Sequence, residues 1–295
     1  MAPVGHEAGA AGTQSARVQV QVVLYRSERW VPQLLAGLRH LTAPPGGLRV
    51  ALWDNEPRPG TASAVADAGT AGTIYQVSPA GNVGFGAAHN ALAAQAPDGC
   101  EYLLVLNPDA VPHYDCLERL VGVAESDPRA ALIEAAQFPI AHPKAYDPAS
   151  RETNWCSAAC LLIRRSAFLE LGGFDEALFL YCEDVDLSWR AWLAGWRCLY
   201  VPEARCLHVT EGQDLAKDRS QEVFHSHLGH LYLRRKYFGE EAAAEYAQQL
   251  RARLAPSLAD RVLERLTSMP VPQTSAARDP HIILHSGEVY AERRW

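Results

Sequence analysis

The stretch GFDEALFLYCEDVDLSWR, residues 173–190, places acidic side chains among large apolar and aromatic residues. From Glu183 onward the apolar residues recur at helical spacing, which predicts an amphipathic helix. Its apolar stripe comprises Val185, Trp189, Trp192 and Leu193. Glu183 and Asp184 open this helix, where carboxylates favour the positive end of the helix dipole. Two interpretations stay open, N-capping by Asp184 and a chemical role for one of the carboxylates.

The two acids are neighbours in the chain, and neighbours on a helix point about 100° apart. Glu183 and Asp184 therefore cannot flank a glycosidic bond as the acid–base pair of a hydrolase does. One of them can still act as a single general base.

Upstream of this stretch, short apolar strands alternate with helical patterns, which predicts a parallel sheet with helices on both faces. The expected strands are residues 18–25, 48–53, 73–77, 102–106 and 131–138. The expected helices are residues 30–41, 61–68, 116–125 and an alanine-rich segment after the glycine-rich turn at residue 81. Downstream we expect strands at 155–163, 197–201 and 204–209, a short helix at 165–171, and helices between residues 218 and 266.

Polar residues stand where several of these strands end. In such sheets ligands bind beyond the carboxyl ends of the strands, so we expect these residues to converge on one crevice. They are Tyr25, Asp54 with Asn55, Asn82 to Gly84, and Asn107 to Asp109.

Asp109 follows an apolar strand and a proline. A carboxylate at a strand end is a suitable ligand for a magnesium or manganese ion that also binds a diphosphate. Asn-Pro-Asp is also strong turn chemistry, so an Asx turn is the alternative. His208 ends a short expected strand and is a candidate for the same metal site, although most lone histidines are not metal ligands.

The glycine-rich segment GNVGFGAAHN, residues 81–90, matches neither a dinucleotide-binding fingerprint nor a P-loop. Gly84 and Gly86 would let the backbone approach a ligand, with helix amides facing an anion. A plain turn and helix start explain the pattern equally well.

Further along, His225, His227 and His230 lie on an expected helix, and only His227 and His230 share a face. A place on the helix surface or packing in the core is the better interpretation for all three. The basic run at residues 234–236 is typical of a solvated helix face, with contact to a phosphate or an anionic membrane surface as the alternative.

The chain has 295 residues and a net charge of −7, so a nucleic-acid partner is not expected. No apolar run reaches the roughly 18 residues that a membrane span needs. Residues 1–16 lack the features of a secretory signal and are expected to be a disordered leader. The seven cysteines are scattered without a C-x-x-C pair, which favours reduced thiols in a cytosolic protein.

Taken together, these motifs resemble glycosyltransferase family 2, the inverting GT-A enzymes, and especially its rhamnosyltransferase-like branch. The order and the spacing of the motifs both match. The matching segments are VVLY (22–25), WDN (53–55), GNVGFGAAHN (81–90), LLVLNPDA (103–110) and the long block 159–209. The resemblance covers residues 17–238.

The resemblance implies an α/β GT-A fold, with a Rossmann-like nucleotide-binding half, a mainly parallel central sheet, an acceptor half and C-terminal helices. The implied GT-A domain is residues 17–238, divided into a nucleotide-sugar half at 17–110 and an acceptor half at 111–238. Residues 239–295 would form a helical extension and tail.

The resemblance also implies roles for residues on the donor side. Asp54 would contact the nucleotide base. Asp109 stands where the family's D-x-D motif ends and would bind a divalent ion, Mn²⁺ or Mg²⁺, in a site that His208 completes. Asn107 takes the place of the first aspartate. Nucleotide-sugar binding is implied for Tyr25, Asp54, Asn55, Asn82, Gly84, Phe85, Asn107 and Asp109, with Asn90 in support.

On the acceptor side, Asp184 matches the aspartate of the family's Glu-Asp motif and would be the catalytic base. Glu183 would orient the acceptor or the base. Four departures from the family pattern leave the donor open, and the last of them also weakens the metal site. They are Arg26 for asparagine, Glu56-Pro57 for a serine-rich turn, Ser157 for glycine, and residues 209–212 for a segment containing glycine and serine.

The implied function is an inverting hexosyltransferase of polysaccharide biosynthesis. It would move a sugar from a dTDP- or UDP-sugar, with dTDP-rhamnose as a candidate, to a saccharide or lipid-linked acceptor. The alternative is a catalytically inactive nucleotide-sugar-binding module. We expect a cytoplasmic protein and leave open peripheral contact with the inner face of the membrane and homodimerisation through the C-terminal helices.

Overall fold

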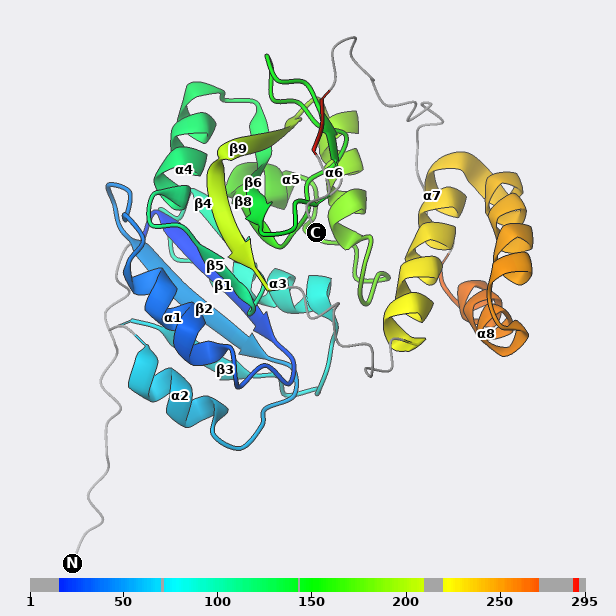
Figure 1. Cartoon of the computed structure of the whole chain (residues 1–295), viewed down its shortest axis with the longest axis horizontal. Helices are drawn as coiled ribbons and strands as arrows, with labels where there is room; N and C mark the ends of the chain where they lie inside the picture. The colour runs from blue at the N-terminus through cyan, green and yellow to red at the C-terminus, as the bar shows by residue number, and fades with distance from the viewer. Residues whose placement is uncertain (1–15, 70–71, 143, 210–219, 271–288, 292–295) are drawn as a thin grey trace, which may run out of the picture.

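The computed structural model describes residues 16–69, 72–142, 144–209, 220–270 and 289–291. Its centre is an eight-stranded sheet with the strand order β3-β2-β1-β4-β8-β6-β9-β5 and helices on both faces (Figure 1). The predicted α/β layering is therefore confirmed. The expected leader lies outside the described residues except for residue 16.

The first half of the chain supplies the parallel part of the sheet. β1 (Val18–Leu24) lies between β2 (Leu48–Asp54) and β4 (Tyr102–Leu106), and β3 (Ile74–Val77) pairs with β2 at the edge. Every residue of β1 is buried, because a parallel strand here is covered on both faces. The predicted bounds of these four strands are correct to within one residue.

Two hydrophobic clusters lie on opposite faces of the sheet. Alternate residues of β4 divide between them, since Leu104 and Leu106 join one cluster and Leu103 and Val105 the other. The first cluster includes residues of α1 (Val31–Arg39), α2 (Thr61–Ala68) and α4 (Cys116–Ser126). The second includes residues of α3 (Phe85–Ala94), α5 (Arg165–Glu170) and α6 (Glu183–Leu193).

The second half of the chain mixes strand directions. β8 (Cys160–Arg164) runs antiparallel to both β4 and β6 (Ala130–Phe138). β9 (Arg197–His208) runs parallel to β6, and the short β5 (Ala110–Pro112) pairs antiparallel with β9 at the sheet edge. β5 was not predicted, and it brings the end of β9 beside the turn that follows β4.

Two strand predictions in this half were wrong. The strands expected at 197–201 and 204–209 are one strand, β9, which continues through an irregularity in its pairing with β6. Pro202, which cannot donate a ladder hydrogen bond, falls in that irregularity. The strand expected at 155–163 begins only at Cys160. Side chains rather than a neighbouring strand bind the N–H groups of residues 156–159 and the carbonyl of Trp155.

The helix α6 begins as predicted, but Asp184 is not its N-cap. That position belongs to Cys182, whose backbone has a left-handed φ of 70°, and Asp184 lies in the first turn. The apolar stripe is only partly buried; Val185, Trp189 and Leu193 pack towards α7. The most buried side chains are Glu183, Asp186, Leu187, Ser188 and Ala191, because α6 also packs against the sheet on its other side.

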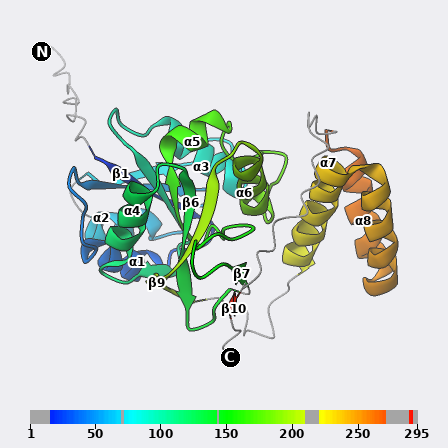
Figure 2. The same cartoon turned by 90° about the horizontal axis from the view of Figure 1, so that it is seen from above.

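The C-terminal helices stand beside α6 as a pair (Figure 2). α7 (Ser220–Arg253) bends at Gly239, whose φ is 88°, and α8 (Pro256–Thr267) packs back against it. The division between residues 17–238 and 239–295 stays a prediction. A short pair of strands, β7 (Lys144–Tyr146) with β10 (Val289–Ala291), was not predicted.

Candidate active site

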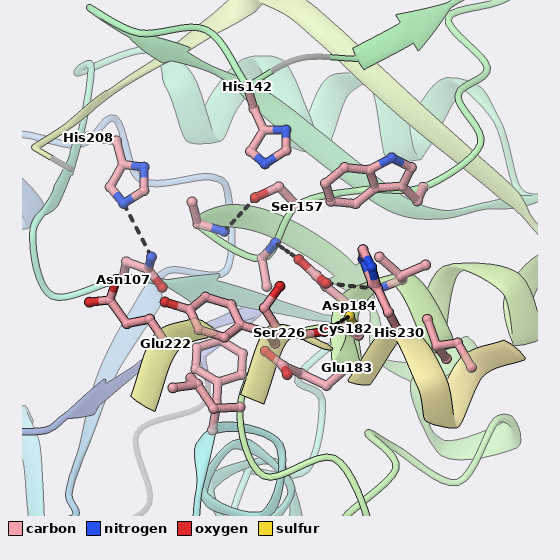
Figure 3. A pocket seen from close by; sticks show the side chains of 18 of the residues that line it. Asn107, His142, Ser157, Cys182, Glu183, Asp184, His208, Glu222, Ser226 and His230 are labelled. Atoms are coloured by element: carbon pink, nitrogen blue, oxygen red, sulfur yellow. Dashed lines mark hydrogen bonds between the residues drawn. The ribbon is translucent and has the colours of Figure 1, made fainter. Parts of the chain in front are cut away.

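A cavity of about 1540 Å³ lies at the carboxyl ends of β1 and β4. One wall comes from residues at strand ends, among them Tyr25, Asn107, Asp109 and His208. We call it the donor wall after the donor-side roles predicted for these residues. The opposite wall comes from α6 and α7. We call it the acceptor wall after the acceptor-side roles predicted for Glu183 and Asp184. Figure 3 shows Asn107 and His208 on one side of the cavity and Glu183 and Asp184 on the other.

Asp109 and His208 lie side by side although they are 99 positions apart in the sequence. The pairing of β5 with β9 sets Ala110 opposite His208, and Val209 donates its backbone N–H to the Asp109 carbonyl at 3.0 Å. His208 Nε2 is 3.4 Å from Asp109 Oδ1 and 3.3 Å from Asn107 Nδ2. The structure therefore brings together the predicted metal ligands.

The hydrogen bonds of His208 fit a metal site. Gln137 donates its amide to Ser157 Oγ, so its Oε1 faces His208 Nδ1 at 2.8 Å and accepts an N–H there. Nε2 of His208 then carries the lone pair and faces Asp109, a nitrogen–carboxylate pair that suits manganese or magnesium. The described residues contain no group of three or more His, Cys, Asp or Glu side chains suited to a metal ion. Further ligands would have to come from a diphosphate and water.

On the acceptor wall, Asp184 is held by two backbone amides. Its Oδ1 accepts the N–H of Val185 at 2.8 Å and its Oδ2 accepts the N–H of Ala158 at 3.1 Å. Burial raises the pKa of Asp184, and these two hydrogen bonds oppose that rise because they favour the ionised form.

Glu183 is in a different environment from its neighbour. It is buried, and its Oε2 has no hydrogen-bond partner in the described part of the chain. Burial raises the pKa of Glu183 well above its ordinary value, and the charge of Asp184 raises it further. Of the two acids, Asp184 is therefore the one that is more readily ionised near neutral pH.

Not all predicted donor residues line the cavity. Tyr25, Phe85, Asn107 and Asp109 do, whereas Asp54, Asn55, Asn82 and Gly84 do not. Asp54 is buried and accepts hydrogen bonds from Tyr75 Oη at 2.8 Å and from the Glu56 N–H at 3.1 Å. The role predicted for Asp54 at the nucleotide base stays a prediction.

The glycine-rich segment packs against the acidic stretch. A Cβ on Gly84, whose φ is 91°, would lie 2.5 Å from the Phe179 carbonyl oxygen, which accepts the N–H of Phe85 at 2.9 Å. Asn55 donates to the Gly84 carbonyl at 3.1 Å, and Asn82 Oδ1 accepts the Gly84 N–H at 3.0 Å. In this structure Gly84 thus accommodates the protein's own backbone.

Asn90 reinforces the same contact, since its side chain bonds both the N–H and the carbonyl of Phe174, at 2.8 and 2.9 Å. The supporting role predicted for Asn90 stays a prediction. Its contacts are with the acidic stretch that leads to Asp184.

Two of the departures from the family pattern contact each other. Arg26 Nε lies 2.8 Å from Glu56 Oε1, and Arg58 pairs with the same carboxylate at 3.0 Å. Arg26 also lines the cavity, with its guanidinium 5.2 Å from the centre of the Tyr25 ring. Of residues 209–212, only Val209 lies within the described residues.

α7 contributes a regular row to the cavity wall, which sequence reasoning missed. The row follows the i, i+4 spacing that marks one helix face. It comprises Glu222, Ser226, His230, Arg234 and Phe238, and Ala242 lines the cavity from beyond the bend at Gly239. The spacing of these residues in the sequence was the available signal.

The basic run is not a solvated face, as its sequence had suggested. Arg235 donates to the carbonyls of Leu266, Met269 and Pro270, and Lys236 is mostly buried between two carboxylates. Arg234 alone of the three lines the cavity. The packing predicted for the histidines agrees with the contacts of His227 and His230 with Tyr246 Oη, at 2.8 and 3.2 Å.

Comparison with known proteins shows where this architecture occurs. A family model described as glycosyltransferase like family 2 matches residues 16–223. The chain belongs to glycosyltransferase family 2. The predicted family and the assignment as a glycosyltransferase are thereby confirmed. Within the parts of the chain that the structure describes, no helix combines the length and the apolarity required to traverse a bilayer.

Its relatives include rhamnosyltransferases. The N-acetylglucosaminyl-diphospho-decaprenol L-rhamnosyltransferase of Mycobacterium tuberculosis (strain H37Rv) is 31% identical over 233 residues, which cover 64% of this chain and 75% of the relative. Rhamnosyltransferase WbbL of Escherichia coli (strain K12) is 28% identical over 190 residues, which cover 53% of this chain and 72% of the relative.

Solved structures show the same fold. The mannosyltransferase PcManGT from Pyrobaculum calidifontis, in complex with GDP-Man and Mn²⁺, aligns with a TM-score of 0.59 at 17% identity, covering 85% of this chain and 80% of that one. GalNAc-T7 with UDP, GalNAc and Mn²⁺ aligns with a TM-score of 0.63 at 12% identity, covering 88% of this chain and 59% of that one. The predicted GT-A fold class is confirmed.

Proposed function

We propose that this glycosyltransferase moves a sugar with inversion from a dTDP- or UDP-sugar to a hydroxyl of a saccharide or lipid-linked acceptor. The observation that carries the proposal is the placement of the Asp109–His208 pair and the amide-held Asp184 on opposite walls of one cavity. Such a cavity can hold a nucleotide diphosphate at one end and an acceptor hydroxyl at the other.

In the reaction, the acceptor oxygen attacks the anomeric carbon while the bond from that carbon to the diphosphate oxygen breaks. The acceptor proton passes to Asp184, and the nucleoside diphosphate leaves with the electron pair of the broken bond. Attack from the face opposite the leaving group inverts the anomeric configuration. A base of this kind typically contributes about 10²–10⁴-fold to the rate.

Asp109 and His208 would hold a divalent ion, which offsets the negative charge that grows on the departing diphosphate. A metal ion bound at His208 Nε2 would take the place of the hydrogen bond that Asn107 Nδ2 donates to this nitrogen, since Nε2 has a single lone pair. Glu183, whose carboxyl is buried with a raised pKa, would orient the acceptor or Asp184.

The names of the relatives support rhamnose as the donor sugar and a diphosphate-linked lipid as the acceptor. The acceptor wall is compatible with such a molecule. Arg234 and His230 supply cationic or hydrogen-bonding groups, and Trp189, Leu233 and Phe238 supply apolar surface.

The test is a transfer assay with a panel of dTDP- and UDP-sugars, saccharide and lipid-diphosphate acceptors, and Mn²⁺ or Mg²⁺. We expect release of nucleoside diphosphate that requires an acceptor, with a product of inverted anomeric configuration by NMR. Tight donor binding without release under any combination would instead identify the alternative, a nucleotide-sugar-binding module.

A further inference from the structure

Residues 155–159, which we call the linking segment, are not a strand, yet side chains hold their backbone firmly. On the side of the acceptor wall, Ala158 donates its N–H to Asp184 Oδ2 at 3.1 Å. Cys156 donates its N–H to Ser188 Oγ at 3.0 Å, and that hydroxyl donates to the carbonyl of Asp184 at 2.7 Å. The segment is thus tied to α6 at the residue proposed as the base.

The same segment is tied to the donor wall. The Ala159 carbonyl accepts the backbone N–H of Asn107 at 3.0 Å. The Ser157 hydroxyl accepts Gln137 Nε2 at 3.2 Å, and Gln137 in turn contacts His208 through its Oε1. Five consecutive residues therefore join the two walls.

A buried ion pair lies behind this segment. The side chains of Glu134 and Lys144 are both fully buried, and Glu134 Oε2 lies 2.8 Å from Lys144 Nζ. The same carboxylate oxygen accepts the N–H of Ser157 at 2.6 Å. Lys144 Nζ donates to the Trp155 carbonyl and lies 3.9 Å from the centre of the Trp155 ring.

Stability alone does not account for such a pair. Removing two charges from water costs about as much as their attraction returns, and apolar side chains of similar size are often as stable. The pair does have a specific geometric consequence, because it fixes Ser157 and Trp155. The next amide along the chain, that of Ala158, is the one that holds Asp184.

We propose that Glu134 and Lys144 are positioning residues for sugar transfer, which fix the linking segment so that its Ala158 amide holds Asp184 towards the acceptor hydroxyl. The proposal rests on the proposed function in that Asp184 is taken as the base. The geometric part concerns only the contacts between the pair, the segment and Asp184.

The pair also acts on Asp184 through charge. Burial raises the pKa of Asp184, while the two amide hydrogen bonds and then the positive charge of Lys144 oppose the rise. Burial raises the pKa of Glu134, the pairing with Lys144 opposes that rise, and the charge of Asp184 adds to it. Other titratable groups in the same cavity lining include Glu183 and Cys182 beside Asp184 in the chain, His142, Asp109 and His208, and Glu222, His230 and Arg234 on α7.

Two substitutions test the proposal because they remove opposite charges. K144M removes the positive charge and should raise the pKa of Asp184 by about one unit. E134Q keeps the shape of the side chain and an oxygen for the Ser157 amide, but removes the negative charge and should lower that pKa. The pKa is measured by ¹³C NMR of aspartate-labelled protein, with the Asp184 signal identified by its absence in D184N.

The transfer reaction provides the second readout. The acidic limb of the kcat profile should move to higher pH in K144M and to lower pH in E134Q, with the Kd for nucleoside diphosphate unchanged. R17M is the matched control, since Arg17 forms ion pairs with Glu101 and Glu125 away from the cavity. It should leave the Asp184 pKa and the kcat profile unchanged.

The proposal is overturned if folded E134Q and K144M both leave the Asp184 pKa and kcat unchanged. A rise of the pKa in both variants would instead support the geometric part, because loss of the Ala158 hydrogen bond raises the pKa of Asp184 whichever partner is removed. If K144M does not fold, E134Q decides alone, and an unchanged pKa with unchanged kcat contradicts the proposal. The NMR titration needs no substrate, so failure of the positioning role is distinguishable from failure of the transferase function.

Discussion

The two walls of the cavity are held in place by different kinds of interaction. The donor wall stands at strand ends, where the ladders of β4, β5 and β9 fix the backbone of Asn107, Asp109 and His208. The acceptor wall depends on buried charges between α6 and α7. Backbone ladders follow from apolar patterns that are local in the sequence, whereas a charge network joins residues that no local pattern connects.

That charge network divides the acids of the stretch at residues 173–190 into two groups. Lys236 Nζ lies 2.6 Å from Asp175 Oδ2 and 2.7 Å from Asp186 Oδ1. Tyr237 Oη donates to Asp186 at 2.8 Å, and Arg190 pairs with the same carboxylate at 2.7 Å. Asp175 and Asp186 thus attach α7 to the domain, while Asp184 lines the cavity.

The largest expected effect is on the rate of sugar transfer, and it distinguishes Asp184 from the acids that attach α7. D184N should lower kcat by about 10²–10⁴-fold, because the acceptor proton then has no base, while donor binding stays unchanged. Steady-state kinetics and calorimetry with the nucleotide measure the two quantities. E176Q is the control, since Glu176 lies in the same stretch but is exposed. Near-normal transfer by folded D184N would contradict the base assignment.

Loss of Lys236 should affect stability rather than proton transfer. K236M leaves Asp175 and Asp186 without their shared cation in a buried site, so the free energy of unfolding should fall by about 3 kcal/mol. Chemical denaturation measures this. R119A, which breaks an exposed pair with Asp115, should have little effect. Equal stability of K236M and the wild type would show that the charges do not attach α7.

Arg234 tests what the acceptor wall binds. It lines the cavity, stacks on Tyr246 with its guanidinium 5.0 Å from the ring centre, and has no carboxylate partner within the part of the chain described. R234A should raise KM for a diphosphate-linked acceptor about tenfold and leave KM for the donor unchanged. R251A on an exposed face of α7 is the control. An equal rise in both KM values would place Arg234 with the donor instead.

The smallest expected effect is on the pH dependence of stability, to which Glu183 contributes. Its pKa in the folded state is raised, so its contribution to stability is present below the unfolded pKa and is lost as pH rises through the folded pKa. E183Q does not titrate there, so between pH 5 and pH 8 its unfolding free energy should gain about 1 kcal/mol relative to the wild type. A parallel pH dependence in both proteins would show that Glu183 is not held protonated.

The contrast between the walls also explains what the sequence could predict. Apolar runs and helical spacing predicted β1 to β4 and most helices, because those elements depend on residues close together in the chain. Family resemblance selected Asp109, His208 and Asp184. The structure places all three at the cavity.

The rest depends on contacts that are distant in sequence. Nothing near Lys144 indicates that its partner is Glu134, and nothing in residues 155–159 indicates that side chains replace a strand ladder. A charged Glu134 inside the apolar run of β6 was the one visible signal, since a buried carboxylate needs a partner. The prediction of a solvated face for the basic run at residues 234–236 was wrong for the same reason, because the carboxylates that pair with Lys236 lie far upstream in the sequence.

The central claim is that one wall binds the donor through Asp109 while the other performs the proton transfer. The most direct test is a thermal-shift titration of dTDP, UDP and their sugars, with and without Mn²⁺, on the wild type, D109A and D184N. We expect one nucleotide to raise Tm in a manner that requires the metal, by an amount equivalent to about 2.7 kcal/mol at a hundredfold excess over Kd. That shift should vanish in D109A and persist in D184N. A shift that survives D109A, or no shift with any nucleotide, would contradict the account.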